Sequence, residues 1–334
     1  MTDKTVAVIT TIQAPTLSVQ TTAKRLSKDG ISLIVIGDRK GPWSYELSGT
    51  RLYSLTEQEE MPYRLARVLP TGHYARKNLG YLVAMREGAS CIYETDDDNA
   101  PNSVWVKRNE IVPVQRIEKT GWCNVYSLFT SEKIWPRGLP LDKIDASLSD
   151  GVVRVCADKV QAPIQQGLAN LSPDVDAVWR MVLDRDFCFD DGPSVLLPRN
   201  SWCPFNSQST WWWPSAYPLM YLPSNCPFRM TDIWRSFIAQ RCLWEFADGI
   251  VFHHAEVDQE RNFHNLMRDF EDEIPGYVKN ARIVDLLQSL SLKAGVEHVC
   301  DNLIACYRAL VAEEVFPQEE LCLVAAWLDD MNNL

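Results

Sequence analysis

The chain has 334 residues, enough for one large α/β domain with a helical extension or for two domains. Hydrophobic residues make up 46% and charged residues 23%, which is ordinary for a soluble globular protein and argues against disorder. A formal net charge of −11 argues against nonspecific binding to nucleic acid or anionic membranes, so we expect no nucleic-acid partner. An anionic substrate would need a local cluster of basic residues.

The ten cysteines are scattered without closely spaced pairs, and there are only five histidines. This pattern indicates neither a zinc ribbon nor a disulfide framework, and it fits a reducing compartment. The sequence also contains no run of about 18 apolar residues. We therefore expect a cytoplasmic protein without a transmembrane segment.

The first segments of the chain are predicted to form a strand, a helix and a second strand, joined by short loops. These are Val6–Ile12, Ser18–Asp29 and Ile31–Ile36. Such a unit builds a parallel sheet. Asp38 and Arg39 then follow the second strand, at the edge where open α/β sheets bind ligands. The alternative is that both belong to a polar turn.

A further helix is predicted from Tyr74 to Glu87, with Gly88 as its C-terminal stop. Arg76 and Lys77 lie in its first turn, where cations oppose the helix dipole and so do not stabilise the helix. A helix N-terminus beside an arginine and a lysine is instead suited to a diphosphate. A solvated surface is the alternative.

An acidic stretch follows the short apolar run Cys91–Tyr93, which is typical of a buried strand. In an extended chain Asp96 and Asp98 point to the same side and Asp97 points away, unless the backbone has already turned. Two carboxylates on one side form an oxygen site suited to Mg²⁺ or Mn²⁺. A solvated acidic turn is the competing interpretation.

The middle of the chain offers two ambiguous segments. Ile134–Pro140 is a rigid loop whose Trp135 and Arg137 either line a sugar site or form a packed corner. Residues 163–180 are predicted to form a loop, a cap and a helix. We interpret Asp174 and Asp176 there as carboxylates at the start of the helix.

The segment Pro204–Pro227 contains three consecutive tryptophans and many prolines. Aromatic rings can pack on sugar rings, and polar side chains can bind hydroxyl groups. The segment is therefore a candidate acceptor wall, with a loop that packs its aromatic residues into the core as the alternative. Its candidate acceptor-binding residues are Asn206, Ser207, Gln208 and Trp211.

Asp232 begins a strongly apolar helix whose polar sector also contains Arg235. A buried polar sector must face partners or a cleft. We expect Asp232 to be a catalytic base and Arg235 to contact the acceptor. The competing interpretation of Asp232 is a helix N-cap.

Several blocks of the chain resemble a known family. Residues 75–80, followed by a short strand and an aspartate cluster, look like the nucleotide-sugar half of GT-A glycosyltransferases. The blocks ITTIQAPT, VIGDRK, RKNLGYLVAMREGA, YETDDDN, IWPRGLP, PIQQGLANLSPDVDAVWR, PFNSQST and DIWRSFIAQRCLWE resemble the STELLO proteins and their microbial relatives. This resemblance runs from about Val6 to about Phe252.

The resemblance implies a GT-A-like, Rossmann-type, mostly parallel sheet flanked by helices, with a helical C-terminal extension. We expect a glycosyltransferase domain over residues 1–255, divided into a nucleotide-sugar half (1–101) and an acceptor half (102–255), and an extension over 256–334. The extension is also a candidate surface for homo-oligomer formation. In the GT-A fold the aspartates form a metal site, to which a late histidine is often added, and here His253 and His254 end a strand-like run.

The resulting hypothesis is a metal-dependent glycosyltransferase that uses Mn²⁺ or Mg²⁺, a nucleotide-diphosphate sugar donor and a glycan or glycolipid acceptor, with inversion favoured. A nucleotide-sugar mutase and a non-catalytic nucleotide-sugar-binding scaffold are the alternatives. The expected donor-binding residues are Thr10, Thr11, Asp38, Arg39, Arg76, Lys77, Asn78, Asp96 and Asp97. The expected metal ligands are Asp96, Asp98, His253 and His254.

Overall fold

The computed structural model describes residues 4–148, 154–260 and 265–334. Its strands are β1 (Thr5–Thr10), β2 (Ser32–Ile36), β3 (Thr50–Tyr53), β4 (Cys91–Thr95), β5 (Asn99–Pro101), β6 (Ile111–Ile117), β7 (Gly121–Trp122), β8 (Arg154–Gln161), β9 (Ile164–Asn170), β10 (Val195–Pro198), β11 (Ser201–Trp202), β12 (Ser209–Trp212) and β13 (Gly249–Gln259). Within these residues one large sheet has the order β3-β2-β1-β4-β12-β9-β13-β10-β6-β8, and β5 pairs with β13 beside this path. The short strands β7 and β11 form a separate pair.

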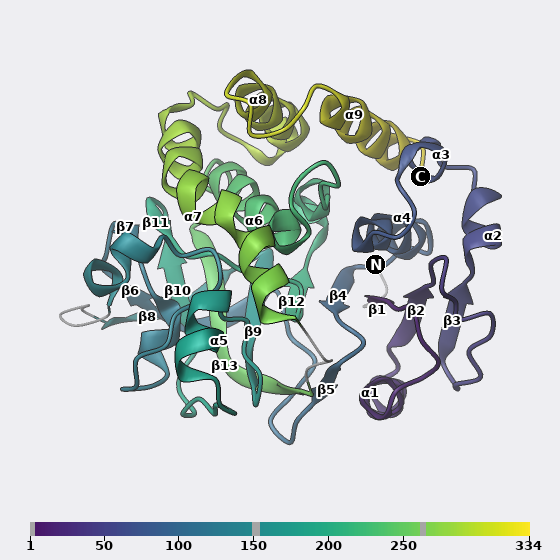
Figure 1. The fold of residues 1–334 in the computed structure, drawn as a ribbon, viewed down its shortest axis with the longest axis horizontal. Helices are drawn as coiled ribbons and strands as arrows, with labels where there is room; N and C mark the ends of the chain where they lie inside the picture. Colours follow the sequence, from purple (N-terminus) through teal and green to yellow (C-terminus); the bar gives the residue numbers. More distant parts are fainter. Residues whose placement is uncertain (1–3, 149–153, 261–264) are drawn as a thin grey trace.

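The helices flank this sheet and cover one end of it (Figure 1). They are α1 (Leu17–Lys28), α2 (Leu55–Glu59), α3 (Arg64–Val68), α4 (Lys77–Arg86), α5 (Ala177–Leu183), α6 (Thr231–Leu243), α7 (Leu266–Ser289), α8 (Val299–Ala312) and α9 (Glu319–Asn332). None of the helices in the described ranges combines the length and apolarity needed to cross a bilayer.

The N-terminal half of the sheet is parallel, as the alternation of strand and helix predicts. β1 pairs in parallel with both β2 and β4, and β2 pairs in parallel with β3. Side chains alternate between the two faces, so Val8 packs with the α4 side of the core and Ala7 with the α1 side. Gly80 lets α4 approach β1 closely, because a Cβ there would lie 2.5 Å from a methyl group of Val8. The carboxyl ends of β1, β2 and β4 consequently share one edge.

The second half of the sheet is mixed, and one prediction for it is wrong. Residues Ile164–Asn170, expected to be a loop, form β9, which pairs in parallel with β13 and antiparallel with β12. Gln165 and Gln166 made this segment look like a loop. Both side chains are buried, and each amide is hydrogen-bonded: Gln165 donates to the Asn109 carbonyl at 2.9 Å, and Gln166 contacts Asn206. A buried strand can carry polar residues when their hydrogen bonds are satisfied in this way.

The C-terminal helices form the expected extension, although residues 261–264 at its start lie outside the described residues. α7 and α8 pack against α6, and α9 returns to pack against α3 in the N-terminal half (Figure 1). The Asp330 carboxylate on α9 accepts hydrogen bonds from the backbone N–H groups of Arg64 and Leu65 at 2.8 and 2.7 Å. The indole of Trp327 donates to the Pro218 carbonyl at 3.0 Å. The α/β class with a helical extension is confirmed, and the domain boundaries stay a prediction.

Candidate active site

A cavity of about 800 Å³ opens at the carboxyl ends of β1, β2 and β4 and is closed on its other side by loops of the second half of the sheet. This is where ligands bind in open α/β folds. Of the residues predicted to bind the donor, the acceptor or a metal or to act as the base, those that line it are Thr10, Thr11, Asp38, Arg39, Arg76, Asp96, Asp97, Asp98, Ser207, Gln208 and Asp232. Those outside its lining are Lys77, Asn78, Asn206, Trp211, Arg235, His253 and His254.

The acidic turn directly follows β4, and all three of its aspartates reach the cavity because the backbone has already turned at Asp97. Asp97 is tied to the segment after β1: Thr11 Oγ1 donates to its carboxylate at 2.5 Å, and Thr16 Oγ1 donates to its carbonyl at 2.8 Å. Asp98 accepts a hydrogen bond from Gln259 Nε2 at 3.0 Å. The turn is therefore held from both halves of the sheet.

Two carboxyl groups of this turn, those of Asp96 and Asp98, have raised pKa values. Burial raises the pKa of Asp96 to about 6, although the Lys77 ammonium, 2.7 Å from Asp96 Oδ1, opposes the rise. Burial, followed by the negative charges of Asp96 and Asp97, raises the pKa of Asp98 to about 7. Negative charge in this turn is incompletely compensated by the protein itself.

Arg76 and Lys77, predicted to hold a diphosphate together, point to different places. Lys77 lies behind the acidic turn, where it pairs with Asp96. Arg76 lies at the β2 end of the cavity, where its Nε donates to Gln58 Oε1 at 2.6 Å and its Nη1 to the Leu69 carbonyl at 3.2 Å. Its Nη2 is buried without a hydrogen-bond partner. An unmet donor on a buried cation makes Arg76 the better ligand-binding candidate of the two.

Two other donor-site candidates have structural partners. The Asp38 carboxylate accepts backbone hydrogen bonds from Arg39, Gly72 and His73 at 2.7 to 3.1 Å. Asp38 thereby joins the loop after β2 to Gly72 and His73, which precede α4. The Asn78 amide pairs with both backbone groups of Leu222 at 2.8 and 2.9 Å, so it joins the halves of the molecule and does not face the cavity.

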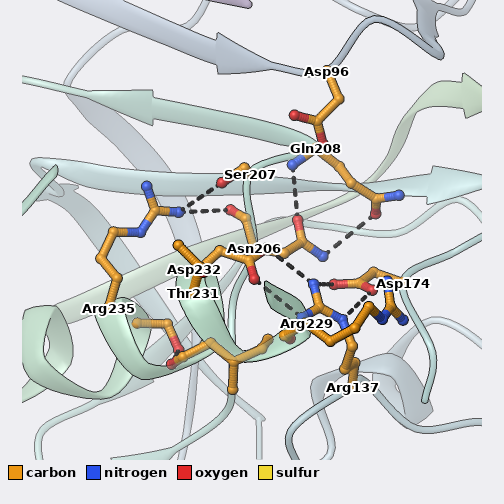
Figure 2. A network of polar contacts seen from close by, with 12 residues as sticks. Asp96, Arg137, Asp174, Asn206, Ser207, Gln208, Arg229, Thr231, Asp232 and Arg235 are labelled. Carbon is orange, nitrogen blue, oxygen red and sulfur yellow. Dashed lines mark hydrogen bonds and ion pairs between the residues drawn. The ribbon is translucent and has the colours of Figure 1, made fainter. Parts of the chain in front are cut away.

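Asp232 lies in the first turn of α6 and faces Arg137, as Figure 2 shows. The Arg137 guanidinium contacts both carboxylate oxygens of Asp232 at 3.1 and 3.0 Å, and both oxygens of Asp174 at 2.7 and 2.8 Å. Burial alone would raise the pKa of Asp232, but the charge and hydrogen bonds of Arg137 hold it below its ordinary value. Asp232 is therefore kept ionised.

The competing interpretation of Asp232 as an N-cap is wrong. The N-cap position of α6 is Met230, and no side chain caps this end. The other two helix-start carboxylates differ from each other: Asp176 does cap α5, accepting from the Trp179 N–H at 2.8 Å, whereas Asp174 pairs with Arg137.

A second buried ion pair lies behind the cavity wall. Arg235 Nη1 contacts both oxygens of Glu94 at 2.9 and 2.8 Å, and its Nη2 donates to Ser207 Oγ at 3.2 Å. The hydroxyl of Tyr81 and the indole of Trp212 also donate to Glu94. Arg235 thus joins α6 to β4 and to the Ser207 loop, and it does not line the cavity itself.

The charged residues of the lining contrast with the chain as a whole. Although the net charge is −11, the lining contains six basic residues and six aspartates. The basic ones are Arg39, Lys40, Arg76, Arg137, Arg180 and Arg229, and the acidic ones are Asp38, Asp96, Asp97, Asp98, Asp174 and Asp232. Arg137 and Arg229 are paired with carboxylates of the protein, whereas Arg39, Lys40 and Arg76 lie toward the β2 end of the cavity. The basic residues that an anionic substrate requires are therefore found at that end.

Comparison with known proteins finds the same family that the sequence motifs resemble. A family model described as STELLO glycosyltransferases matches residues 229–334. The chain is 27% identical over 323 residues to "Probable glycosyltransferase STELLO1" of Arabidopsis thaliana and 25% identical over 328 residues to "Probable glycosyltransferase STELLO2" of the same plant. Each alignment covers 90% of this chain. The predicted resemblance to STELLO glycosyltransferases is confirmed.

The chain spans 41% of the length of each of these two relatives. Among solved structures, it is similar to M. tuberculosis glucosyl-3-phosphoglycerate synthase, with a TM-score of 0.38 and 12% identity over 86% of this chain and 80% of that one. A similarity this weak does not identify site residues.

The tryptophan-rich segment Pro204–Pro227 mostly enters the core. Trp211 is fully buried, its ring centroid lies 4.3 Å from that of Tyr93, and its indole donates to Glu256 at 3.0 Å. Packing into the core, the alternative interpretation, therefore describes Trp211. Asn206 lies under the surface in contact with Gln166, and only Ser207 and Gln208 of this group reach the cavity.

The two histidines lie away from the acidic turn. His253 is buried between Ser194 Oγ at 2.7 Å and Gln165 Oε1 at 3.0 Å, and His254 Nδ1 lies 3.1 Å from the exposed Asp191. Both are on β13, whose last residue, Gln259, is the one that reaches the cavity. Their hydrogen bonds explain both side chains without a metal.

The acidic turn fits a Mg²⁺ or Mn²⁺ ion only in part. Two cavity-facing carboxylates, Asp96 and Asp98, provide hard oxygen ligands. Within the described ranges, no group of three or more histidine, cysteine or acidic side chains is arranged to hold a metal. Such a donor set suits an ion that takes its other ligands from water and from substrate phosphates, as Mg²⁺ usually does.

The sequence pattern left the roles of three site residues open or unseen. It placed Arg137 either at a sugar site or in a packed corner, indicated Asp174 only as a helix-start carboxylate, and gave no signal for Gln259. Their roles come from pairings across the cavity, between residues 37, 95 and 161 positions apart. The arginine in the rigid Ile134–Pro140 loop was the one signal that pointed to this network.

Proposed function

We propose that the chain is a metal-dependent glycosyltransferase that moves a sugar from a nucleotide-diphosphate donor to an acceptor hydroxyl, with inversion of configuration. The main support is that one cavity brings together the acidic turn after β4, a cluster of basic residues and the ionised Asp232. These are the parts needed to hold an anionic donor and to accept a proton. The similarity to STELLO glycosyltransferases points in the same direction.

The donor is expected to extend from the β2 end of the cavity to the acidic turn. Arg76, with its unmet Nη2 donor, favours an acceptor atom of the nucleoside or phosphate near Asp38. Asp96 and Asp98 would hold Mg²⁺ or Mn²⁺, which neutralises the charge that develops on the leaving diphosphate. Lys77 positions Asp96 from behind through its 2.7 Å ion pair.

Asp232 is the candidate base. An inverting transfer needs a group that takes the proton of the acceptor hydroxyl, and this group must be ionised and within reach of the acceptor. Asp232 lines the cavity and is held ionised by Arg137. Because Arg137 also fixes both carboxylate oxygens, the geometry of the base is set before the acceptor binds.

Thermal-shift measurement with nucleoside diphosphates and nucleotide sugars, with and without Mn²⁺, tests the proposal. A ligand that binds only the folded chain stabilises it by about 2.7 kcal/mol at 100 times Kd. We expect a metal-dependent increment in the wild type that Asp98→Ala abolishes without unfolding the protein. Asp285→Ala, an exposed aspartate on α7, is the matched control and should keep the increment. Equal metal-dependent stabilisation in Asp98→Ala and wild type would refute the metal site.

A further inference from the structure

The cavity has an aromatic wall that the sequence did not reveal. Phe228, in a short 3₁₀ turn just before α6, lines the cavity with 49% of its surface exposed. Its ring centroid lies 5.0 Å from that of Tyr74 and 5.4 Å from that of His73, in edge-to-face geometry. The rings of His73 and Tyr74 stack on each other at 5.7 Å and 7°. We call His73, Tyr74 and Phe228 the aromatic wall.

The aromatic wall joins the two halves of the molecule. His73 and Tyr74 precede α4, next to the loop that Asp38 holds, while Phe228 precedes α6. Phe228 presents apolar surface to the cavity, and a ligand that covers this surface would gain binding free energy. The neighbouring rings fix its position, so a flat, partly apolar surface is available to a ligand.

The aromatic wall is also joined to the candidate base. The Tyr74 hydroxyl accepts a hydrogen bond from the backbone N–H of Asp232 at 2.9 Å. Phe228 precedes Asp232 by only four residues, and both line the same cavity. A ring that stacks on Phe228 would therefore place its substituents near the Asp232 carboxylate.

The charges beside the aromatic wall indicate which ligand fits. Arg229 is paired with Glu273 at 2.8 Å, and Arg137 is shared between Asp174 and Asp232. The cluster of Arg137, Asp174 and Asp232 thus has one excess negative charge. Both guanidinium groups are engaged with carboxylates of the protein, so an anionic ligand would meet repulsion here, whereas hydroxyl groups could donate to the carboxylates.

We propose that Phe228, supported by His73 and Tyr74, is the platform on which the ring of a neutral acceptor sugar stacks beside Asp232. This inference rests on the proposed glycosyltransferase function and adds the acceptor class: an uncharged pyranose, without a phosphate or carboxylate on the ring that stacks. It also replaces the tryptophan-rich segment as the apolar part of the acceptor site.

Calorimetric titration tests the platform with defined sugars. The probes are maltotriose, cellotriose and mannotriose as neutral trisaccharides, and trigalacturonic acid as the anionic counterpart. They are added to the chain in the presence of Mg²⁺ and the nucleoside diphosphate that stabilises it most. We expect at least one neutral trisaccharide to bind and trigalacturonic acid to bind more weakly. Phe228→Ala should weaken binding of the neutral sugar by about 10-fold, or about 1.4 kcal/mol, because the apolar surface that the sugar covers is removed.

Three comparisons keep this test decisive. Phe228→Trp should retain the sugar, and Trp43→Ala, which removes an exposed aromatic ring outside the cavity lining, should not affect it. Nucleoside diphosphate stabilisation should be equal in all variants, which shows that they fold. Three results would overturn the platform. They are unchanged sugar affinity in Phe228→Ala, no binding of any neutral trisaccharide by the wild type, and a Phe228→Ala variant that loses nucleoside diphosphate affinity but keeps its sugar affinity. If sugars bind through Phe228 but no nucleotide binds, the proposed transferase fails and the sugar platform stands.

Discussion

Two groups of carboxylates face the same cavity, and their environments push their pKa values in opposite directions. At the acidic turn, burial raises the pKa of Asp96 to about 6 and that of Asp98 to about 7. At the start of α6, Arg137 outweighs burial and lowers the pKa of Asp232. Burial affects all three groups, so the difference comes from the positive charge available to each.

This contrast separates two chemical roles. The acidic turn has one ammonium, Lys77, for three aspartates, so it has negative charge to spare for a cation. The α6 carboxylate has a bidentate guanidinium and is ionised without any added ligand. Carboxylates whose environments differ in this way commonly divide the work of one active site.

The largest expected effect comes from removing the ionised carboxylate. Asp232→Asn keeps the shape of the side chain but cannot accept a proton, so we expect turnover to fall by about 10²–10⁴-fold with donor binding intact. The measurement uses the nucleotide sugar identified by thermal shift, and nucleotide affinity serves as the binding control. Because α6 has no side-chain cap, a lost cap cannot explain a reduced rate. Near-normal turnover would remove Asp232 from the mechanism.

The next effect comes from removing the guanidinium that creates the contrast. Arg137→Met leaves Asp174 and Asp232 buried without their shared partner, which should cost about 3–5 kcal/mol of unfolding free energy. Arg185→Met, which breaks an exposed ion pair with Glu132, is the matched control and should cost at most about 1 kcal/mol.

The dependence of this loss on pH identifies its cause. The pKa of Asp232 is depressed in the folded chain, so its stabilisation is present above the ordinary aspartate pKa of 3.8 and is lost as pH falls through the folded value. The difference between wild type and Arg137→Met, measured by denaturant unfolding, should therefore be largest near pH 7 and shrink below about pH 4. A difference that does not change with pH would assign Arg137 a packing role.

The parts of this site that depend on local sequence could be predicted. Short apolar runs gave β1, β2 and β4, and the aspartates that follow β4 gave the acidic turn. In each case the strand and the polar residues at its end are adjacent in the chain. The parallel order of the strands then brings these ends to one edge.

The parts that depend on distant partners could not be predicted. Arg137 faces Asp174 and Asp232 because two separate loops meet the first turn of α6, and no local sequence pattern predicts this contact. Gln165 and Trp211 also could not be placed from the local sequence. Their polar groups look suited to loops or ligands, but both are buried because other residues satisfy their hydrogen bonds.

The smallest expected effect is a gain of stability at the acidic turn. Folding raises the pKa of Asp98 from 3.8 to about 7, so the stability that this group contributes is fully present below pH 3.8 and is lost as pH rises through about 7. Asp98→Asn removes this charge, and its amide oxygen can still accept from Gln259. A shift of this size corresponds to about 4 kcal/mol, which screening by solvent at a half-buried group reduces to about 1–2 kcal/mol.

Denaturant unfolding in the presence of a metal chelator should show Asp98→Asn equal to wild type near pH 4 and more stable by that amount above pH 7. The exposed Asp285→Asn should show no such trend. Adding Mn²⁺ and a nucleoside diphosphate should then stabilise wild type more than Asp98→Asn, because the variant has lost a charged ligand. A variant less stable than wild type at pH 8 without metal would mean that the Asp98 charge is already compensated within the protein. In that case the acidic turn would no longer differ from Asp232, and the separation of roles between them would fail.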